Sequence, residues 1–229
     1  YVANNPIVYT DPDGRKIDPE SQKEWNDQKQ HIVDKRDKLQ AKINKLNTEA
    51  IKKGWNAEKL AKKIGNKQER VSGLNTVISN LAVLEESAQT YSLNSGATNN
   101  KLSYDATTGN IVISYSGTAL FAHEATHAGQ FEIGDIAFAS NGSSLAQDVY
   151  DEVASYKAQW AYNPSSVGGL SSTNQITASW VQGIKDPTSG DQPYKPGGSA
   201  NTGISSVNVN STRDELIRAY PHQESTLRQ

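Results

Sequence analysis

The stretch from residue 20 to residue 93 constrains the fold most strongly, because it lacks proline and repeats apolar residues at helical spacing. In its middle, Gly54 suits the end of one helix and Asn56 suits the N-cap of the next. We therefore predict two long antiparallel helices, a helical hairpin spanning residues 20–93. The apolar residues of its two stripes are Trp25, Ile32, Leu39, Ile43 and Leu46, then Leu60, Ile64, Val71, Leu74, Ile78 and Leu81.

Lysines crowd the second part of this hairpin, and such a cluster can face nucleic acid, a membrane or simply water. Glu49, Glu58 and Glu69 interrupt the run, and the whole chain has a formal net charge of -2. We therefore interpret the lysines as a solvated helix face and predict no nucleic-acid partner. They are Lys52, Lys53, Lys59, Lys62, Lys63 and Lys67.

Composition narrows the class of protein further. Hydrophobic residues make up only 35% of the chain, but charges of both signs are mixed, so we expect a globular rather than a disordered chain. The longest apolar runs, such as "NIVISYSG" and "TALFAH", are too short to span a bilayer, so no transmembrane segment is expected. Cysteine is absent, which excludes disulfides and thiolate metal sites. The N-terminus lacks the pattern of a signal peptide. Because the sequence starts at Tyr1 rather than at an initiator methionine, we expect it to be the C-terminal portion of a longer protein.

The segment "FAHEATHAGQ" at residues 121–130 holds two of the four histidines. Residues four apart project from one face of a helix, so His123 and His127 can direct ring nitrogens toward a single metal ion. Glu124 lies beside the first histidine, where it can accept a proton from a water molecule that zinc polarises. We therefore predict a Zn2+ site with His123 and His127 as ligands and Glu124 as catalytic base. A surface helix with two unrelated histidines is the alternative.

This His-Glu-x-x-His motif, on an apolar helix that follows a strand, resembles the zincin metallopeptidases over residues 100–160. The metzincin continuation is missing, because Gln130 and Ile133 stand where that subclass has a glycine and a third ligand. The layout is similar to that of gluzincins, in which a glutamate on the following helix completes the site. The resemblance therefore implies Glu152 as the third metal ligand. Asp135, placed after the motif helix as in aspzincins, is the alternative.

Two further roles in such a site have several candidates. Metal-bound histidines usually donate their second ring N–H to an oxygen, for which Asp148, Asp151 or a backbone carbonyl could serve. Zincins also steady the oxyanion formed during hydrolysis with a tyrosine or histidine. The candidates for that second role are Tyr150, Tyr156, Tyr220 and His222. His31 lies in the charged helix, where we expect it to be exposed to solvent.

The remaining elements follow from turn residues and periodicity. Residues 100–117 contain two strand-like segments around a Thr-Thr-Gly-Asn turn, which predicts a β-hairpin. The second strand, "NIVISYS", leads into the motif helix, and the zincin resemblance implies that it presents its edge to an extended peptide. Another helix is expected at residues 143–162, ending before Pro164. Mostly loops follow, with an amphipathic piece "NQITASWVQGI", a strand "ISSVNV" and a last helix "STRDELIRAY".

These elements predict a mainly helical α+β fold in three parts. Residues 1–19, rich in Asn-Pro, Asp-Pro and Asp-Gly turns, form a connector. Residues 20–93 form the helical hairpin. Residues 94–229 form a small zincin-like domain with a short β-hairpin beside the motif helix.

The connector resembles the end of the core of Rhs (YD-repeat) proteins, in which this pattern marks the boundary between a large shell and a variable C-terminal toxin. Arg15 departs from the family, where many members carry an apolar residue after the glycine. In that family the boundary is often near a self-cleavage point, which in this sequence corresponds to the region of Gly14. The residues that carry the likeness are Tyr1, Asn4, Asn5, Pro6, Asp11, Pro12 and Gly14.

The two resemblances together imply a zinc metallopeptidase toxin that acts on a peptide or protein substrate. They also imply delivery into a target cell through a specialised secretion system, an Rhs shell as carrier and a cognate immunity protein. One alternative is a non-catalytic helical interaction module. Another is a zinc amidase acting on a non-protein amide such as peptidoglycan, because zinc activates water toward any amide.

Overall fold

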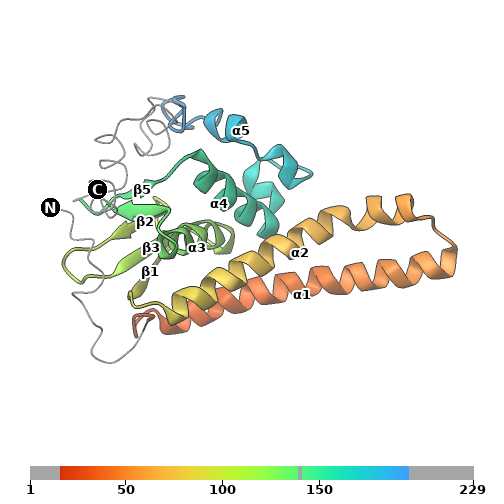
Figure 1. The fold of residues 1–229 in the computed structure, drawn as a ribbon, viewed down its shortest axis with the longest axis horizontal. Helices are drawn as coiled ribbons and strands as arrows, with labels where there is room; N and C mark the ends of the chain where they lie inside the picture. Colours follow the sequence, from red (N-terminus) through yellow and green to blue (C-terminus); the bar gives the residue numbers. More distant parts are fainter. Residues whose placement is uncertain (1–15, 139–140, 196–229) are drawn as a thin grey trace, which may run out of the picture.

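The structure is a computed structural model that describes residues 16–138 and 141–195. Its described part has the mainly helical α+β fold that the sequence predicts, with a long helical hairpin against a body of helices and short strands (Figure 1). The strand expected at "ISSVNV", the last helix, Tyr220, His222 and most of the connector lie outside the described residues. Among those described, no helix is both long enough and apolar enough to cross a membrane.

The hairpin consists of α1 (Gln22–Lys53) and α2 (Ala57–Glu86). Gly54 ends α1 in the left-handed conformation, with φ of 59°, and its N–H faces the last carbonyls of the helix. The Asn56 side chain caps α2 by accepting the Lys59 N–H at 2.9 Å. The predicted roles of Gly54 at the end of α1 and of Asn56 as the N-cap of α2 are thus confirmed. The buried apolar residues of the hairpin are Trp25, Ile32, Leu39, Ile43, Ala50, Ile64, Leu74, Val77, Leu81 and Leu84.

A three-stranded sheet follows the hairpin, in the order β1 (Tyr91–Ser95), β3 (Ile111–Tyr115), β2 (Lys101–Tyr104). The predicted β-hairpin is confirmed as the antiparallel pair β2 and β3. The sequence analysis did not foresee β1, which pairs with β3 in parallel. Because β1 covers its other side, β3 is the central strand, and the expectation that it offers a free edge is wrong.

The motif helix is α3 (Thr118–Glu132), which begins just after β3. Two short antiparallel strands then form, β4 (Ile136–Phe138) and β5 (Ser144–Ala146), before α4 (Val149–Tyr162). The expected helix at 143–162 therefore starts six residues too early, since its first residues pair with β4. After α4 come two short 3-10 turns, Pro164–Val167 and Thr173–Gln175, and then α5 (Ala178–Gln182).

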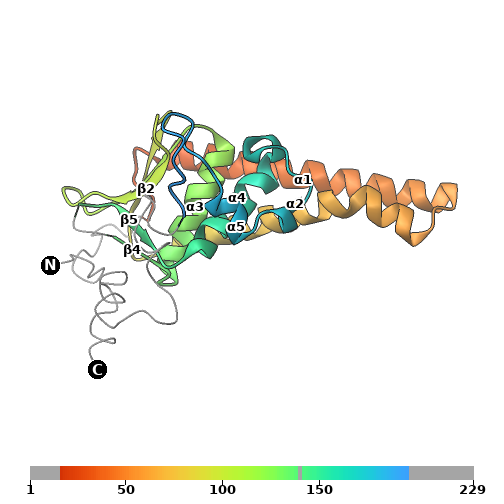
Figure 2. The same cartoon turned by 90° about the horizontal axis from the view of Figure 1, so that it is seen from above.

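One hydrophobic core joins the proximal half of the hairpin to the body. Trp25 of α1 packs edge-on against Phe121 of α3, with ring centroids 5.9 Å apart, and both side chains are fully buried. The body covers only the proximal half of the hairpin and the other half projects beyond it, as the view from above shows (Figure 2). Strand β1 crosses the expected boundary between residues 93 and 94. The predicted boundary between the helical hairpin and the zincin-like domain at this position remains a prediction.

Candidate metal centre

Helix α3 carries the His-Glu-x-x-His motif through the centre of the body. All ten residues from 121 to 130 are buried, including His123, Glu124 and His127. Ionisable side chains are seldom buried unless they are paired or coordinate a metal. The burial of three such groups within five residues therefore points to a polar site.

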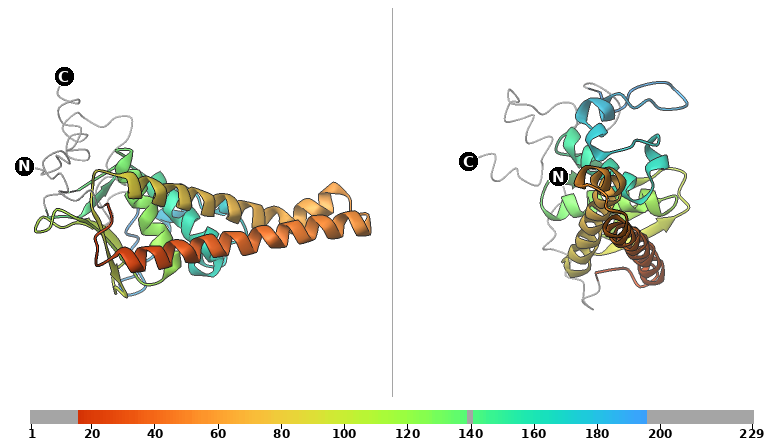
Figure 3. Two further views of the ribbon diagram at one scale, coloured as in Figure 1. Left: turned by 90° about the horizontal axis from the view of Figure 1, so that it is seen from below. Right: turned by 90° about the vertical axis from the view of Figure 1, so that its right-hand side faces the viewer.

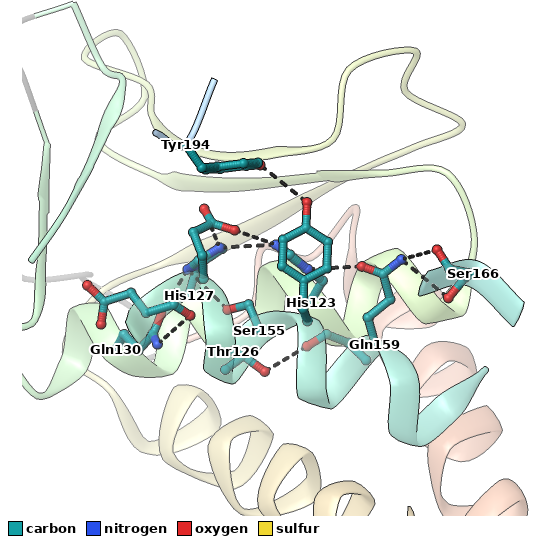
Figure 4. Close-up of polar contacts among 12 residues, drawn as sticks. His123, Thr126, His127, Gln130, Ser155, Gln159, Ser166 and Tyr194 are labelled. Carbon is teal, nitrogen blue, oxygen red and sulfur yellow. Dashed lines mark hydrogen bonds and ion pairs between the residues drawn. The ribbon is translucent and has the colours of Figure 1, made fainter. Parts of the chain in front are cut away.

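Helix α4 brings Glu152 to the two imidazoles (Figure 4). The Nε2 atoms of His123 and His127 are 3.2 Å apart, and each lies 3.4 Å from a different carboxylate oxygen of Glu152. One ligand atom from each of these residues lies within 4.8 Å of the others, and all three residues are buried. This His–His–Glu group could bind a metal ion.

Two glutamines fix the orientation of the imidazoles. The Oε1 atom of Gln159 lies 3.0 Å from Nδ1 of His123, and that of Gln130 lies 2.8 Å from Nδ1 of His127. The amide nitrogens donate elsewhere, that of Gln159 to the Ser166 carbonyl and that of Gln130 to the Asp151 carbonyl. An amide oxygen only accepts, so each Nδ1 is the donor and each Nε2 is turned toward Glu152.

Charges in the site are strongly coupled. Burial by itself would lower the pKa of His127, but the Glu152 carboxylate raises it to about 9. Burial also opposes ionisation of Glu152, yet the charge on His127 and the contacts of both histidines with the carboxylate hold the pKa of Glu152 well below its usual range. Without a metal, the pair therefore exists as an imidazolium and a carboxylate near neutral pH.

Glu124 lies on the side of the site nearest the sheet. Burial raises the pKa of its carboxyl, while the charges of His123 and His127 and the backbone N–H of Leu102 in β2 oppose that increase. Since Leu102 belongs to the outer strand of the sheet, the motif glutamate lies beside β2. The outer side of β2 is partly paired further along, where the Tyr104 N–H bonds to the Gly142 carbonyl at 2.8 Å.

Two tyrosines lie beside the histidines. The Tyr156 ring packs edge-on against His123, with centroids 4.7 Å apart, and its hydroxyl lies 3.4 Å from that of Tyr194. Burial and the nearby Glu152 carboxylate raise the pKa of both phenols, that of Tyr156 to about 12. Figure 4 shows Tyr194 above the histidines. Tyr150, another candidate from the sequence, is 65% exposed and faces solvent.

The structure separates the other candidate residues from the cluster. Asp135 is only half-buried and lies outside the group of converging ligand atoms, so Glu152 is the carboxylate that meets the histidines. Of the open candidates for orienting the histidines, the carboxylates of Asp148 and Asp151 do not take that role, because Gln159 and Gln130 face the Nδ1 atoms instead. The two carboxylates cap α4: Asp148 accepts the Tyr150 N–H at 2.7 Å, and Asp151 accepts the Asp148 N–H at 3.1 Å. His31 is exposed on α1, as expected.

Sequence reasoning missed Gln130, Ser155, Gln159 and Tyr194. Helical spacing could have found the first three. Gln130 follows His127 by three positions, while Ser155 and Gln159 follow Glu152 by three and seven, so each shares a helix face with a candidate ligand. Tyr194 lies in a loop with no such periodicity, and only the fold brings it to the site.

Comparisons of the chain with protein-family models, with curated proteins and with solved structures found no match. The class of site therefore rests on its geometry: two histidines from one helix and a glutamate from the next, buried, with a second glutamate alongside.

Proposed function

We propose that this chain is a zinc-dependent metallopeptidase. The observation that carries the proposal is the convergence of His123, His127 and Glu152 on one point, within 4.8 Å of one another. A structural ion pair alone would not require two imidazoles with both Nε2 atoms turned inward. Glu124, buried beside these residues, supplies the base that hydrolysis needs.

The donor set fits zinc. Two imidazole nitrogens and one carboxylate oxygen are the ligands of many catalytic zinc sites, which leave a fourth position open. The Oε2 atom of Glu152 is buried and faces Nε2 of His123 at 3.4 Å, too far for a well-formed hydrogen bond. Such an atom is costly to bury unless a cation satisfies it.

The proposed chemistry divides between the metal and the protein. A zinc ion at this site would polarise a water molecule for attack on an amide carbonyl. Glu124 accepts the proton that the water loses and passes it to the leaving amine. Burial, which raises its pKa, brings this carboxyl nearer to the operating pH of a general base.

Other residues of the site would position and stabilise the substrate. The Tyr156 ring packs against His123 and its hydroxyl faces that of Tyr194, so either hydroxyl could donate a hydrogen bond to the developing oxyanion. Strand β2 is the edge of the sheet nearest Glu124, so an extended peptide would lie along β2 near Leu102.

The biological role that we propose is that of a toxin. The turn-rich N-terminal pattern that resembles the end of an Rhs core supports it. In this role the chain is carried by an Rhs shell, delivered into a target cell by a specialised secretion system, and neutralised in the producer by an immunity protein. Producing the chain inside bacterial cells, with and without the Glu124→Gln substitution, tests the role. Equal toxicity of the two would exclude a catalytic toxin.

The catalytic proposal is tested with purified protein and peptide libraries. Glu124→Gln keeps the shape of the side chain and should retain bound zinc, while hydrolysis falls on the order of 100-fold or more. Glu58→Gln, at an exposed position of α2, is the matched control and should leave both unchanged. Cleavage of peptidoglycan but not of peptides would favour the amidase alternative. Absence of bound zinc together with unchanged function in Glu124→Gln would favour a non-catalytic interaction module.

A further inference from the structure

The distal half of the helical hairpin extends well beyond the rest of the molecule (Figures 1 and 3). The Asn66 side chain still bonds to the body, donating to the Ser171 carbonyl at 2.7 Å. Beyond it, residues 40–65 form what we call the arm tip, in which α1 and α2 pack on each other through buried Ile43 and Ile64. The two helices are thus paired to the end of the hairpin, and nothing in the proposed metallopeptidase mechanism uses the arm tip.

The arm tip concentrates positive charge. It contains seven lysines and two glutamates, a formal charge of plus five, in a chain whose net charge is -2. The rest of the chain therefore carries minus seven. All seven lysines are exposed to solvent. They are Lys42, Lys45, Lys52, Lys53, Lys59, Lys62 and Lys63.

Apolar side chains lie at the end of this basic tip. Ile51, in the last turn of α1, is 84% exposed, more than any other large apolar side chain in the described part of the chain. Trp55 follows at the turn, half-buried among lysine side chains. The ammonium groups of Lys53, Lys59 and Lys63 lie 5.7, 5.2 and 5.1 Å from the centre of its ring.

We propose that the arm tip binds the surface of a membrane that contains anionic lipid. Tryptophan and lysine are characteristic of the membrane interface, where the indole lies at headgroup depth and lysines meet anionic headgroups. When the hairpin meets the bilayer end-on, the Ile51 side chain at the apex can enter the apolar part of the bilayer.

Two observations favour a membrane over nucleic acid. The tip has no arginine, the residue best suited to paired hydrogen bonds with phosphates. An isoleucine that is 84% exposed at the apex also has no role in binding a phosphate backbone, whereas it gains from contact with acyl chains. The body, with its opposite charge, would be held away from the anionic surface by the length of the arm.

The test uses the full chain and vesicles of phosphatidylcholine, with or without phosphatidylserine. We expect sedimentation only with phosphatidylserine, and weaker binding as salt increases. Replacing Lys52, Lys59 and Lys62 with glutamine should weaken binding by about 100-fold, roughly fivefold for each lysine. The matched control replaces three exposed lysines of the rest of the chain, Lys23, Lys101 and Lys185, and should leave binding nearly unchanged.

The apolar contact has its own test. Ile51→Ser should weaken binding, whereas Val83→Ser, at a 47% exposed site beside the body, should not. Brominated lipid should quench part of the tryptophan fluorescence of the wild type, and this quenched part should be missing in Trp55→Phe.

Three results would each overturn the proposal: failure to bind phosphatidylserine vesicles, equal losses of binding in the two triple-lysine variants, or binding of DNA in place of vesicles. Glu124→Gln should bind vesicles like the wild type, so this result does not depend on the peptidase activity.

Discussion

The side-chain oxygen of Gln159 lies 3.0 Å from Nδ1 of His123, while its amide nitrogen donates to the Ser166 carbonyl at 3.1 Å. The second contact determines which end of the amide faces the imidazole. Gln159 therefore holds His123 as the tautomer with a free Nε2, the form that can bind a metal.

We predict that Gln159→Leu, which keeps the approximate volume of the side chain, lowers zinc affinity by about 10- to 100-fold. The physical reason is the loss of the acceptor that orients His123. Competition with a chromophoric chelator measures the affinity. Gln68→Leu, at an exposed position of α2, provides the control and should bind zinc like the wild type. An unchanged affinity in Gln159→Leu would show that the imidazole needs no such support.

A second prediction distinguishes Glu152 from Asp135 as the third zinc ligand. Glu152→Ala removes a carboxylate that lies 3.4 Å from both imidazoles, and zinc retention should fall by on the order of 100-fold or more. Asp135→Ala should retain the metal, because Asp135 lies outside the cluster. Metal analysis after gel filtration of both variants distinguishes them. Loss of zinc from Asp135→Ala alone would reverse the assignment.

Zinc affinity should keep rising with pH up to about pH 9. In the metal-free protein, Glu152 raises the pKa of His127 to about 9, so the imidazole is protonated at neutral pH and must release one proton when zinc binds. The affinity should therefore rise by about tenfold per pH unit up to about pH 9, rather than level off near 6.5 as for an ordinary histidine. Calorimetry in two buffers of different ionisation enthalpy measures the released proton. A plateau below pH 7 would contradict the coupling.

The contact between the hairpin and α4 depends on a glycine. A Cβ at Gly73 would come within 2.7 Å of the Ala161 Cβ, whereas one at Gly65, on the same helix, would meet nothing within 4 Å. Both changes to alanine gain the same helix propensity. We therefore expect Gly73→Ala to be less stable than Gly65→Ala by roughly 1–3 kcal/mol, owing to overpacking alone. Urea unfolding measures the difference in stability. Equal midpoints for the two variants would show that α2 and α4 can move apart without loss of stability.

Much of the candidate site follows from helical periodicity. The spacing of His123 and His127 places both on one face whatever the rest of the chain does, because the α-helix repeats every 3.6 residues. The same repeat extends from Glu152 to Ser155 and Gln159, although which carboxylate would meet the histidines depended on how α3 and α4 pack. Asp148 and Asp151 illustrate the limit: a carboxylate near a helix start can cap it or support a ligand, and local sequence does not decide.

The sequence by itself determined the two long helices, their ends at Gly54 and Asn56, the β2–β3 hairpin and the shared face of the two histidines, because each depends on residues only a few positions apart. Tertiary structure alone decided that β1 pairs with β3 and removes its free edge, that Glu152 rather than Asp135 meets the imidazoles, and that Tyr194 lies above them. These depend on pairing and packing between distant segments, whose partners local propensity does not specify.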